Sequence, residues 1–285
     1  MKFPAFAYAA PTTVDEAVAL LAEDEDARPL AGGQSLLPIM ALRMAAPSLL
    51  VDLGAIASLR EVRDGPQSVR IGAMVTHAAN ARSAAVRDRL PLVGDALHFV
   101  AHQAVRNRGT FGGSLAHADP GAEMPVVVTA LGGTMLVVGA GGERSVAPEE
   151  FFQGLYTTAV GQGELLVAVD LPVSPLRWTF DEVARRAGDL AMAMVAVGVR
   201  DDDNGCAEAR IVLGGVSDRP CRAPAAEAYL SGRALTEDVA REAGRLAAAD
   251  LDARSDHHAN AALRRSMAAA LVRRSLLRLA AGDPR

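Results

Sequence analysis

Two adjacent glycines interrupt the apolar stretch "LAGGQSLLPIM" at residues 30–40 and constrain how this part of the chain folds. Residues 28–32 read as a short apolar strand, residues 35–44 as a helix and residues 48–54 as a second strand, so we predict a βαβ unit. Glycines between such a strand and helix let backbone N–H groups point outward, and the loop is therefore either a tight turn or a phosphate site. Ser35 would then either cap the helix or bond a phosphate oxygen.

A second loop of the same kind, "TFGGS" at residues 110–114, also has two glycines between small hydroxyl residues. Two such loops on separate subdomains would suit a ligand with two phosphates lying between them, such as a dinucleotide. Other patterns are missing: the chain has no GK[ST] and no GxSxG, and "GAGGER" has Arg144 at the third glycine position of GxGxxG. A hydrolase using Ser114 and His117 is disfavoured because no acid partner is evident.

Length, charge and hydropathy narrow the class of protein that this chain can belong to. A chain of 285 residues is long for one core, because domains usually hold about 100 to 200 residues, so we expect two domains. The formal charge of −5 argues against a nucleic-acid partner, which would require a basic face. No apolar run reaches the roughly 18 residues of a membrane span, and we predict a cytoplasmic protein.

Neither the cysteines nor the histidines indicate a metal site. Cys206 and Cys221 are the only cysteines, too few for a disulfide framework or an iron–sulfur cluster. His98 and His102 have the i, i+4 spacing of metal ligands on a helix, but no third ligand is evident. We therefore expect no metal in this chain.

Local signals place further elements. Thr13 and Glu16 form a capping-box pattern at the start of a helix, and Asn204-Gly205 predicts a hairpin because both residues tolerate positive φ angles. The two prolines within residues 171–178 mark the best domain boundary. The last fifty residues are rich in alanine, leucine and arginine and are expected to be mostly helical.

Three stretches, "LAGGQSLLPIM", "RNRGTFGGSLAHADPGAEMP" and "FDEVARRAGDLAMAMVAV", occur in an order and spacing that resemble the FAD-binding medium subunit of the molybdenum hydroxylases, which include carbon monoxide dehydrogenase and xanthine dehydrogenase. The resemblance covers essentially the whole chain and implies an α+β fold. Residues 1–173 would form an FAD-binding domain of the vanillyl-alcohol-oxidase (PCMH) type, in subdomains of about 1–57 and 58–173. Residues 177–285 would form a smaller α+β C-terminal domain of the carbon monoxide dehydrogenase flavoprotein type.

The resemblance also implies a set of FAD-binding residues. The first loop would wrap the pyrophosphate through its backbone, and the second loop would meet it from the other subdomain. Glu123 stands where relatives usually have an acidic residue, often the shorter aspartate, near the flavin nucleotide. Asp119 would either touch the cofactor or bond its own loop, and Leu166 would either pack on the flavin or fill the core. The implied residues are Ala31, Gly32, Gly33, Gln34, Ser35, Thr110, Gly112, Gly113, Ser114, Asp119, Glu123 and Leu166.

By the same resemblance, this subunit would transform no organic substrate and would carry no catalytic acid, base or nucleophile. A molybdenum cofactor in a large subunit would hydroxylate the substrate, and two [2Fe-2S] clusters in a small subunit would pass electrons to FAD in this chain, in a dimer of heterotrimers. The alternative is a stand-alone FAD-dependent oxidase or dehydrogenase of the same superfamily. The substrate and the final electron acceptor stay open.

Overall fold

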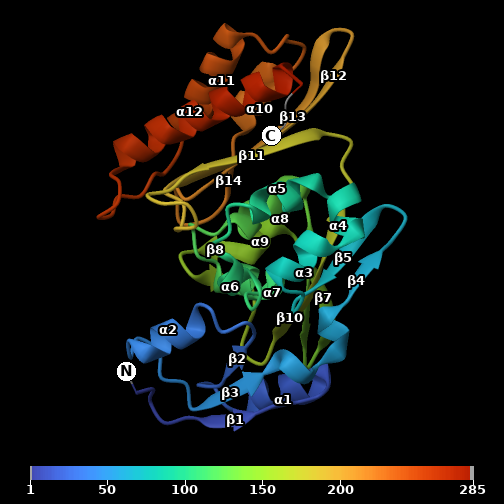
Figure 1. Ribbon diagram of the computed structural model, residues 1–285, viewed down its shortest axis with the longest axis vertical. Coiled ribbons are helices and arrows are strands. Elements are labelled where there is room, and N and C mark those ends of the chain that lie inside the picture. Colours follow the sequence, from blue (N-terminus) through green and yellow to red (C-terminus); the bar gives the residue numbers. More distant parts are fainter. Residues whose placement is uncertain (1, 283–285) are drawn as a thin grey trace.

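The computed structural model describes residues 2–282, and Figure 1 shows them in three layers, each built on its own sheet. The lowest layer is a parallel sheet in the order β1-β3-β2, so the predicted βαβ unit, formed by β2, α2 and β3, is confirmed. The predicted capping box is present too, because the Thr13 hydroxyl accepts a hydrogen bond from the Glu16 N–H at 3.2 Å. The elements of this layer are β1 (Ala7–Ala9), α1 (Val14–Glu23), β2 (Arg28–Leu30), α2 (Leu36–Ala41), β3 (Leu49–Asp52) and the 3-10 helices Leu53–Ala55 and Ala57–Arg60.

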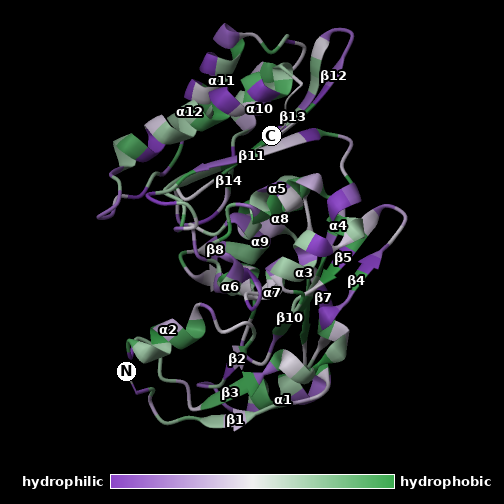
Figure 2. Ribbon diagram, viewed as in Figure 1, coloured by the Kyte–Doolittle hydropathy of each residue, from purple (hydrophilic) through white to green (hydrophobic). Residues whose placement is uncertain are grey.

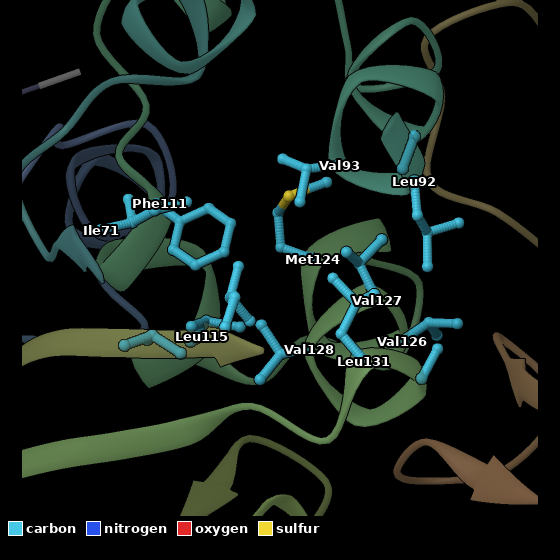
Figure 3. Packing of buried hydrophobic residues seen from close by; sticks show 14 of the residues in the cluster. Ile71, Leu92, Val93, Phe111, Leu115, Met124, Val126, Val127, Val128 and Leu131 are labelled. Carbon is cyan, nitrogen blue, oxygen red and sulfur yellow. The ribbon is translucent and has the colours of Figure 1, made fainter. Parts of the chain in front are cut away.

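The middle layer is an antiparallel sheet in the order β4-β5-β10-β6-β7, with short helices packed against it. Helix α8 is buried along its whole length, and Figure 3 shows its Met124, Val127 and Leu131 among the core side chains. The elements of this layer are β4 (Val62–Asp64), β5 (Ser68–Gly72), α3 (His77–Arg82), α4 (Ala84–Arg89), α5 (Pro91–Leu97), α6 (Gln103–Arg106), α7 (Phe111–His117), α8 (Glu123–Leu131), β6 (Thr134–Gly139), β7 (Gly142–Val146), α9 (Pro148–Phe151), β8 (Phe152–Gly154), β9 (Thr157–Thr158) and β10 (Leu165–Pro172).

The upper layer is an antiparallel sheet in the order β11-β12-β13-β14. One face of this sheet carries Trp178 and Phe180 into the core of the middle layer, and the other face is covered by helices α10 to α12, which confirms the predicted helical C-terminus. Figure 2 shows both polar and apolar residues along α12, as expected of a helix with one buried face. The elements are β11 (Arg177–Val183), β12 (Ala193–Asp202), β13 (Gly205–Gly214), β14 (Cys221–Arg222), α10 (Pro224–Leu230), α11 (Glu237–Ala249) and α12 (Ala261–Ala280).

The structure corrects two local predictions. The hairpin between β12 and β13 is present, but Asp202 pairs with Gly205, and only Gly205 of the predicted Asn204-Gly205 dipeptide has a positive φ, at 115°. The helix expected over residues 35–44 covers only residues 36–41, because the chain turns through a left-handed conformation at Arg43.

His98 and His102 do not share a helix. Helix α5 ends at Leu97, the backbone at Ala101 is left-handed with φ of 38°, and His102 precedes α6. Among residues 2–282, no group of three histidine, cysteine or acidic side chains is placed to hold a metal ion. In the same part of the chain, no helix combines the length and the apolar character needed to cross a bilayer.

Candidate cofactor site

The two glycine loops face each other across a pocket of about 390 Å³ between the lower and middle layers. The loops are in direct contact: a Cβ atom on Gly32 would lie 2.1 Å from the carbonyl oxygen of Arg108, and one on Gly113 would lie 3.4 Å from the Cβ of Ala31. The pocket is lined by Arg28, Pro29, Ala31, Gly32, Gly33, Gln34, Ser35, Leu36, His77, Val100, Ala101, Val105, Gly109, Thr110, Gly113, Ser114, Ala116, His117, Asp119, Ala122, Glu123, Gly188, Asp189 and Leu190.

The first loop has unpaired backbone donors beside this pocket. Within residues 2–282, the N–H groups of Gly32, Gly33, Gln34 and Ser35 donate no hydrogen bond. The Gln34 side chain donates from Nε2 to the Gly32 carbonyl at 3.1 Å and so braces the loop. The Ser35 hydroxyl does not cap α2. Four unpaired N–H groups in a row beside a pocket form an anion-binding surface, and the loop therefore has the chemistry of a phosphate site rather than of a closed turn.

The second loop acts differently, because the backbone donors of Gly112, Gly113 and Ser114 are already used. The Thr110 hydroxyl caps α7 by accepting from the Gly113 N–H at 3.0 Å, and the Ser114 N–H donates to the Thr110 carbonyl at 3.0 Å. The Gly112 N–H donates to the Ala73 carbonyl at 2.9 Å; Gly112 is buried against Ala73 and does not line the pocket. The glycines of this loop thus let its backbone come close to the first loop, and Ser114 adds a hydroxyl group to the pocket lining. The first loop instead contributes free N–H groups.

Three carboxyl groups line the pocket, those of Asp119, Glu123 and Asp189, and the first two were expected from the sequence. The Asp119 side chain bonds its own loop, because its Oδ1 accepts a hydrogen bond from the Gly121 N–H at 2.8 Å. This is one of the two roles that the sequence left open for Asp119. Its Oδ2 accepts from the Tyr156 hydroxyl at 3.1 Å. Glu123 opens helix α8 and is buried, and burial raises the pKa of its carboxyl group to about 8, with smaller contributions from the nearby Glu182 and Asp119. Glu123 therefore holds a proton at neutral pH and can donate a hydrogen bond into the pocket.

Leu166, another predicted site residue, does not line the pocket. It is buried on β10 within the hydrophobic core of the middle layer and is not among the side chains that line the pocket. The burial of its side chain favours a role in the core, which is the second of the two interpretations offered by the sequence.

Sequence reasoning missed several residues of the pocket wall. His77 is buried beside Gly109, its Nδ1 has no hydrogen-bond partner, and burial together with the charge of Arg106 lowers the pKa of its imidazole to about 4. Segment 188–190 comes from the loop between β11 and β12, so the upper layer contributes to the pocket. The only sequence signal for this loop was its place inside "FDEVARRAGDLAMAMVAV". Distant segments of this kind meet only through the tertiary fold.

A row of free N–H groups facing a second glycine loop is typical of proteins that bind nucleotide cofactors, and the residues present fit a dinucleotide pyrophosphate. A family model described as "FAD binding domain in molybdopterin dehydrogenase" matches residues 4–174, and one described as "CO dehydrogenase flavoprotein C-terminal domain" matches residues 178–279. The chain belongs to this family, that is, to the FAD-binding medium subunits of molybdenum hydroxylases, which are parts of oxidoreductases. The α+β fold recognised from sequence is thereby confirmed.

Known relatives match along nearly the whole chain. The nicotine 6-hydroxylase medium subunit of Paenarthrobacter nicotinovorans is 40% identical over 97% of this chain and 98% of its own length. The carbon monoxide dehydrogenase medium chain of Hydrogenophaga pseudoflava is 37% identical over 96% of each chain. A chain in the crystal structure of quinoline 2-oxidoreductase from Pseudomonas putida 86 superposes with a TM-score of 0.97 at 46% identity, with full coverage of both chains.

Proposed function

We propose that this chain is the electron-transferring FAD subunit of a molybdenum hydroxylase and that it passes electrons from the [2Fe-2S] clusters of a small subunit to an external acceptor. The observation that carries the proposal is the row of free N–H groups at residues 32–35 facing the second glycine loop. When bound, FAD supplies the redox chemistry. The chain's own task is to hold and orient the cofactor.

The residues of the two loops divide this task. The N–H groups of Gly32, Gly33, Gln34 and Ser35 would donate to the pyrophosphate, with Ala31 at the edge of the loop. Gly113, together with the hydroxyl of Ser114, would close the other side, while Thr110 holds the N-terminal turn of α7 in place. Gly112 would act indirectly, because its lack of a side chain lets α7 pack against Ala73.

The two acids would work beside these loops. Glu123, neutral at pH 7, would donate a hydrogen bond to the nucleotide without adding negative charge beside phosphates. Asp119, already bonded by the Gly121 N–H and the Tyr156 hydroxyl, would hold its loop at the pocket wall.

The domain division and the assembly are part of the same proposal. Residues 1–173 would form the FAD domain, in subdomains of about 1–57 and 58–173, and residues 177–285 the C-terminal domain. The chain would assemble with a small [2Fe-2S] subunit and a large molybdopterin subunit into a dimer of heterotrimers. The names of the relatives, a medium subunit of nicotine 6-hydroxylase and a medium chain of carbon monoxide dehydrogenase, support such partners.

An absorbance spectrum of the purified chain tests the proposal. The spectrum of an oxidised flavin, with FAD released into solution on denaturation, is expected, because the pocket offers hydrogen bonds and no group is required to form a covalent bond. Protein that stays colourless after incubation with FAD would refute the assignment. Flavin reduction by an organic substrate in the absence of partner subunits would instead support the stand-alone oxidase.

A further inference from the structure

Arg28 is the one lysine or arginine among the described residues that line the cofactor pocket. It opens β2, an edge strand of the lower sheet, and its side chain is exposed. Residues two apart in a strand point to the same face, so Arg28 shares a face with Leu30, and a Cβ atom on Gly33 would lie 3.5 Å from Cδ1 of Leu30. One face of β2 therefore carries both this guanidinium and the contact to the first glycine loop.

The guanidinium of Arg28 is held in place through one of its nitrogens. Its Nη1 donates to the carbonyl oxygen of Glu25 at 2.8 Å and to that of Ala27 at 2.7 Å. A guanidinium has five N–H donors, so the three on Nε and Nη2 remain, and within residues 2–282 they donate no hydrogen bond. Because the tether already restrains this long side chain, less conformational entropy is lost when a ligand binds the remaining donors.

Asp24 lies near Arg28 but does not occupy these donors. The Asp24 carboxylate accepts hydrogen bonds from the Ser48 hydroxyl at 2.6 Å and from the Asp26 N–H at 2.9 Å. These bonds lower the pKa of Asp24, and the charge of Arg28 contributes in the same direction. No acid in the described part of the chain forms an ion pair with Arg28. Its positive charge is therefore available to a ligand in the pocket.

Three other ionisable groups of the pocket lining are neutral at pH 7. Burial lowers the pKa of the His77 imidazole to about 4, and burial also lowers the pKa of His117. The buried carboxyl group of Glu123, with a pKa of about 8, keeps its proton. None of these groups supplies a positive charge to the pocket.

The remaining charges of the lining leave a phosphate to Arg28. Asp119 and Asp189 are the other charged residues that line the pocket, and both carry negative charge. Arg106 is close to His77 but does not line the pocket, and its Nη1 donates to the carbonyls of Val100 and Ala101 at 2.6 and 2.7 Å. The free N–H groups of the first loop offer only partial positive charges.

We propose that Arg28 binds a phosphate group of the cofactor through its Nε and Nη2 donors and supplies the ionic part of the affinity for FAD. The inference rests on the proposed function and adds to it a binding residue outside both glycine loops. Hydrogen bonds between a guanidinium and a phosphate are charge-assisted and about twice as strong as neutral ones. Salt screens an exposed ion pair, so Arg28 makes the affinity for FAD depend on ionic strength.

Fluorescence titration of FAD into the flavin-free, full-length chain tests the proposal. Arg28→Gln is expected to weaken FAD binding about tenfold at 0.1 M NaCl and about threefold or less at 1 M, because the Debye length shortens from about 10 Å to about 3 Å. The control is Arg241→Gln, which removes an exposed arginine of α11 in the upper layer (Figure 1). Its FAD affinity is expected to stay within about twofold of wild type at both salt concentrations. The thermal midpoint of each variant checks its fold.

Arg28→Lys separates the charge of Arg28 from its tether to Glu25 and Ala27. Lysine keeps the positive charge but lacks the forked donors that bond two carbonyls and a phosphate at once, so this variant is expected to retain most of the salt-dependent affinity. The proposal is overturned if Arg28→Gln binds FAD as tightly as wild type at 0.1 M NaCl, if its loss is equal at both salt concentrations, or if Arg28→Lys loses as much. A wild-type chain that binds no FAD refutes the FAD function itself.

Discussion

Replacing Gly32 with alanine tests whether contact between the two loops shapes the cofactor pocket. The backbone of Gly32 is outside the left-handed region, so alanine is conformationally allowed there. Its Cβ atom would nevertheless lie 2.1 Å from the carbonyl oxygen and 2.8 Å from the carbonyl carbon of Arg108. Because these are backbone atoms, no side chain can swing aside, and the loops must separate by about 1.3 Å or more to reach ordinary contact.

The cost of this separation can be bounded. Inserting a methyl group into a packed region usually costs about 1 to 3 kcal/mol. If the free apo chain relieves the clash by opening the pocket, closing it around FAD restores the clash, and the same 1 to 3 kcal/mol appears as an affinity loss of about 5- to 150-fold. We therefore expect Gly32→Ala to retain a folded C-terminal domain while it binds FAD at least about fivefold more weakly.

Quenching of flavin fluorescence gives the dissociation constant, and the flavin content after gel filtration gives retention. Gly141→Ala is the matched control, because a Cβ atom at Gly141 meets no atom within 4 Å and its φ is not positive. Wild-type affinity is expected for this control. Wild-type FAD affinity in Gly32→Ala would refute the reasoning that the loop contact sets the width of the pocket.

Two further predictions concern buried charge. Glu123 keeps its proton in the folded chain up to a pH of about 8, whereas an unfolded glutamate loses it near pH 4.5. Between these two values the folded state binds one more proton than the unfolded state. The free energy of unfolding therefore falls as pH rises, by up to about 1.4 kcal/mol per pH unit. Glu182, whose pKa burial raises to about 7, acts in the same direction. Urea unfolding of the apo chain between pH 5.5 and 8.5 should show a shallower decline in Glu123→Gln; equal slopes in variant and wild type would contradict the assignment. Asp256→Ala should lower the free energy of unfolding by about 3 to 5 kcal/mol, because it removes the 2.6 Å ion pair of the fully buried Arg264 guanidinium. The control is Asp238→Ala at an exposed ion pair, which should change the free energy of unfolding by less than about 0.5 kcal/mol in the same assay.

Local patterns in the sequence determined much of this protein. The capping box at Thr13 and Glu16, the βαβ unit around residues 28–52 and the helical C-terminus all form as predicted. These features depend on neighbours within a few residues or on one periodic pattern, and such interactions can be read without knowing the rest of the fold. Both glycine loops were visible for the same reason, because glycines between small polar residues are a local backbone signal.

The division of labour between the loops was decided only by the tertiary structure. The two loops look alike in sequence, yet the N–H groups of residues 32–35 are free, whereas those of Gly112 and Ser114 are taken by hydrogen bonds to Ala73 and Thr110. Which backbone donors remain for a ligand depends on every acceptor that folding brings near them. The sequence therefore pointed to the two loops that line the proposed FAD pocket. The fold decided which of their backbone donors stay free, and it placed His77, segment 188–190 and the unpaired Asn80 where no local pattern could have predicted them.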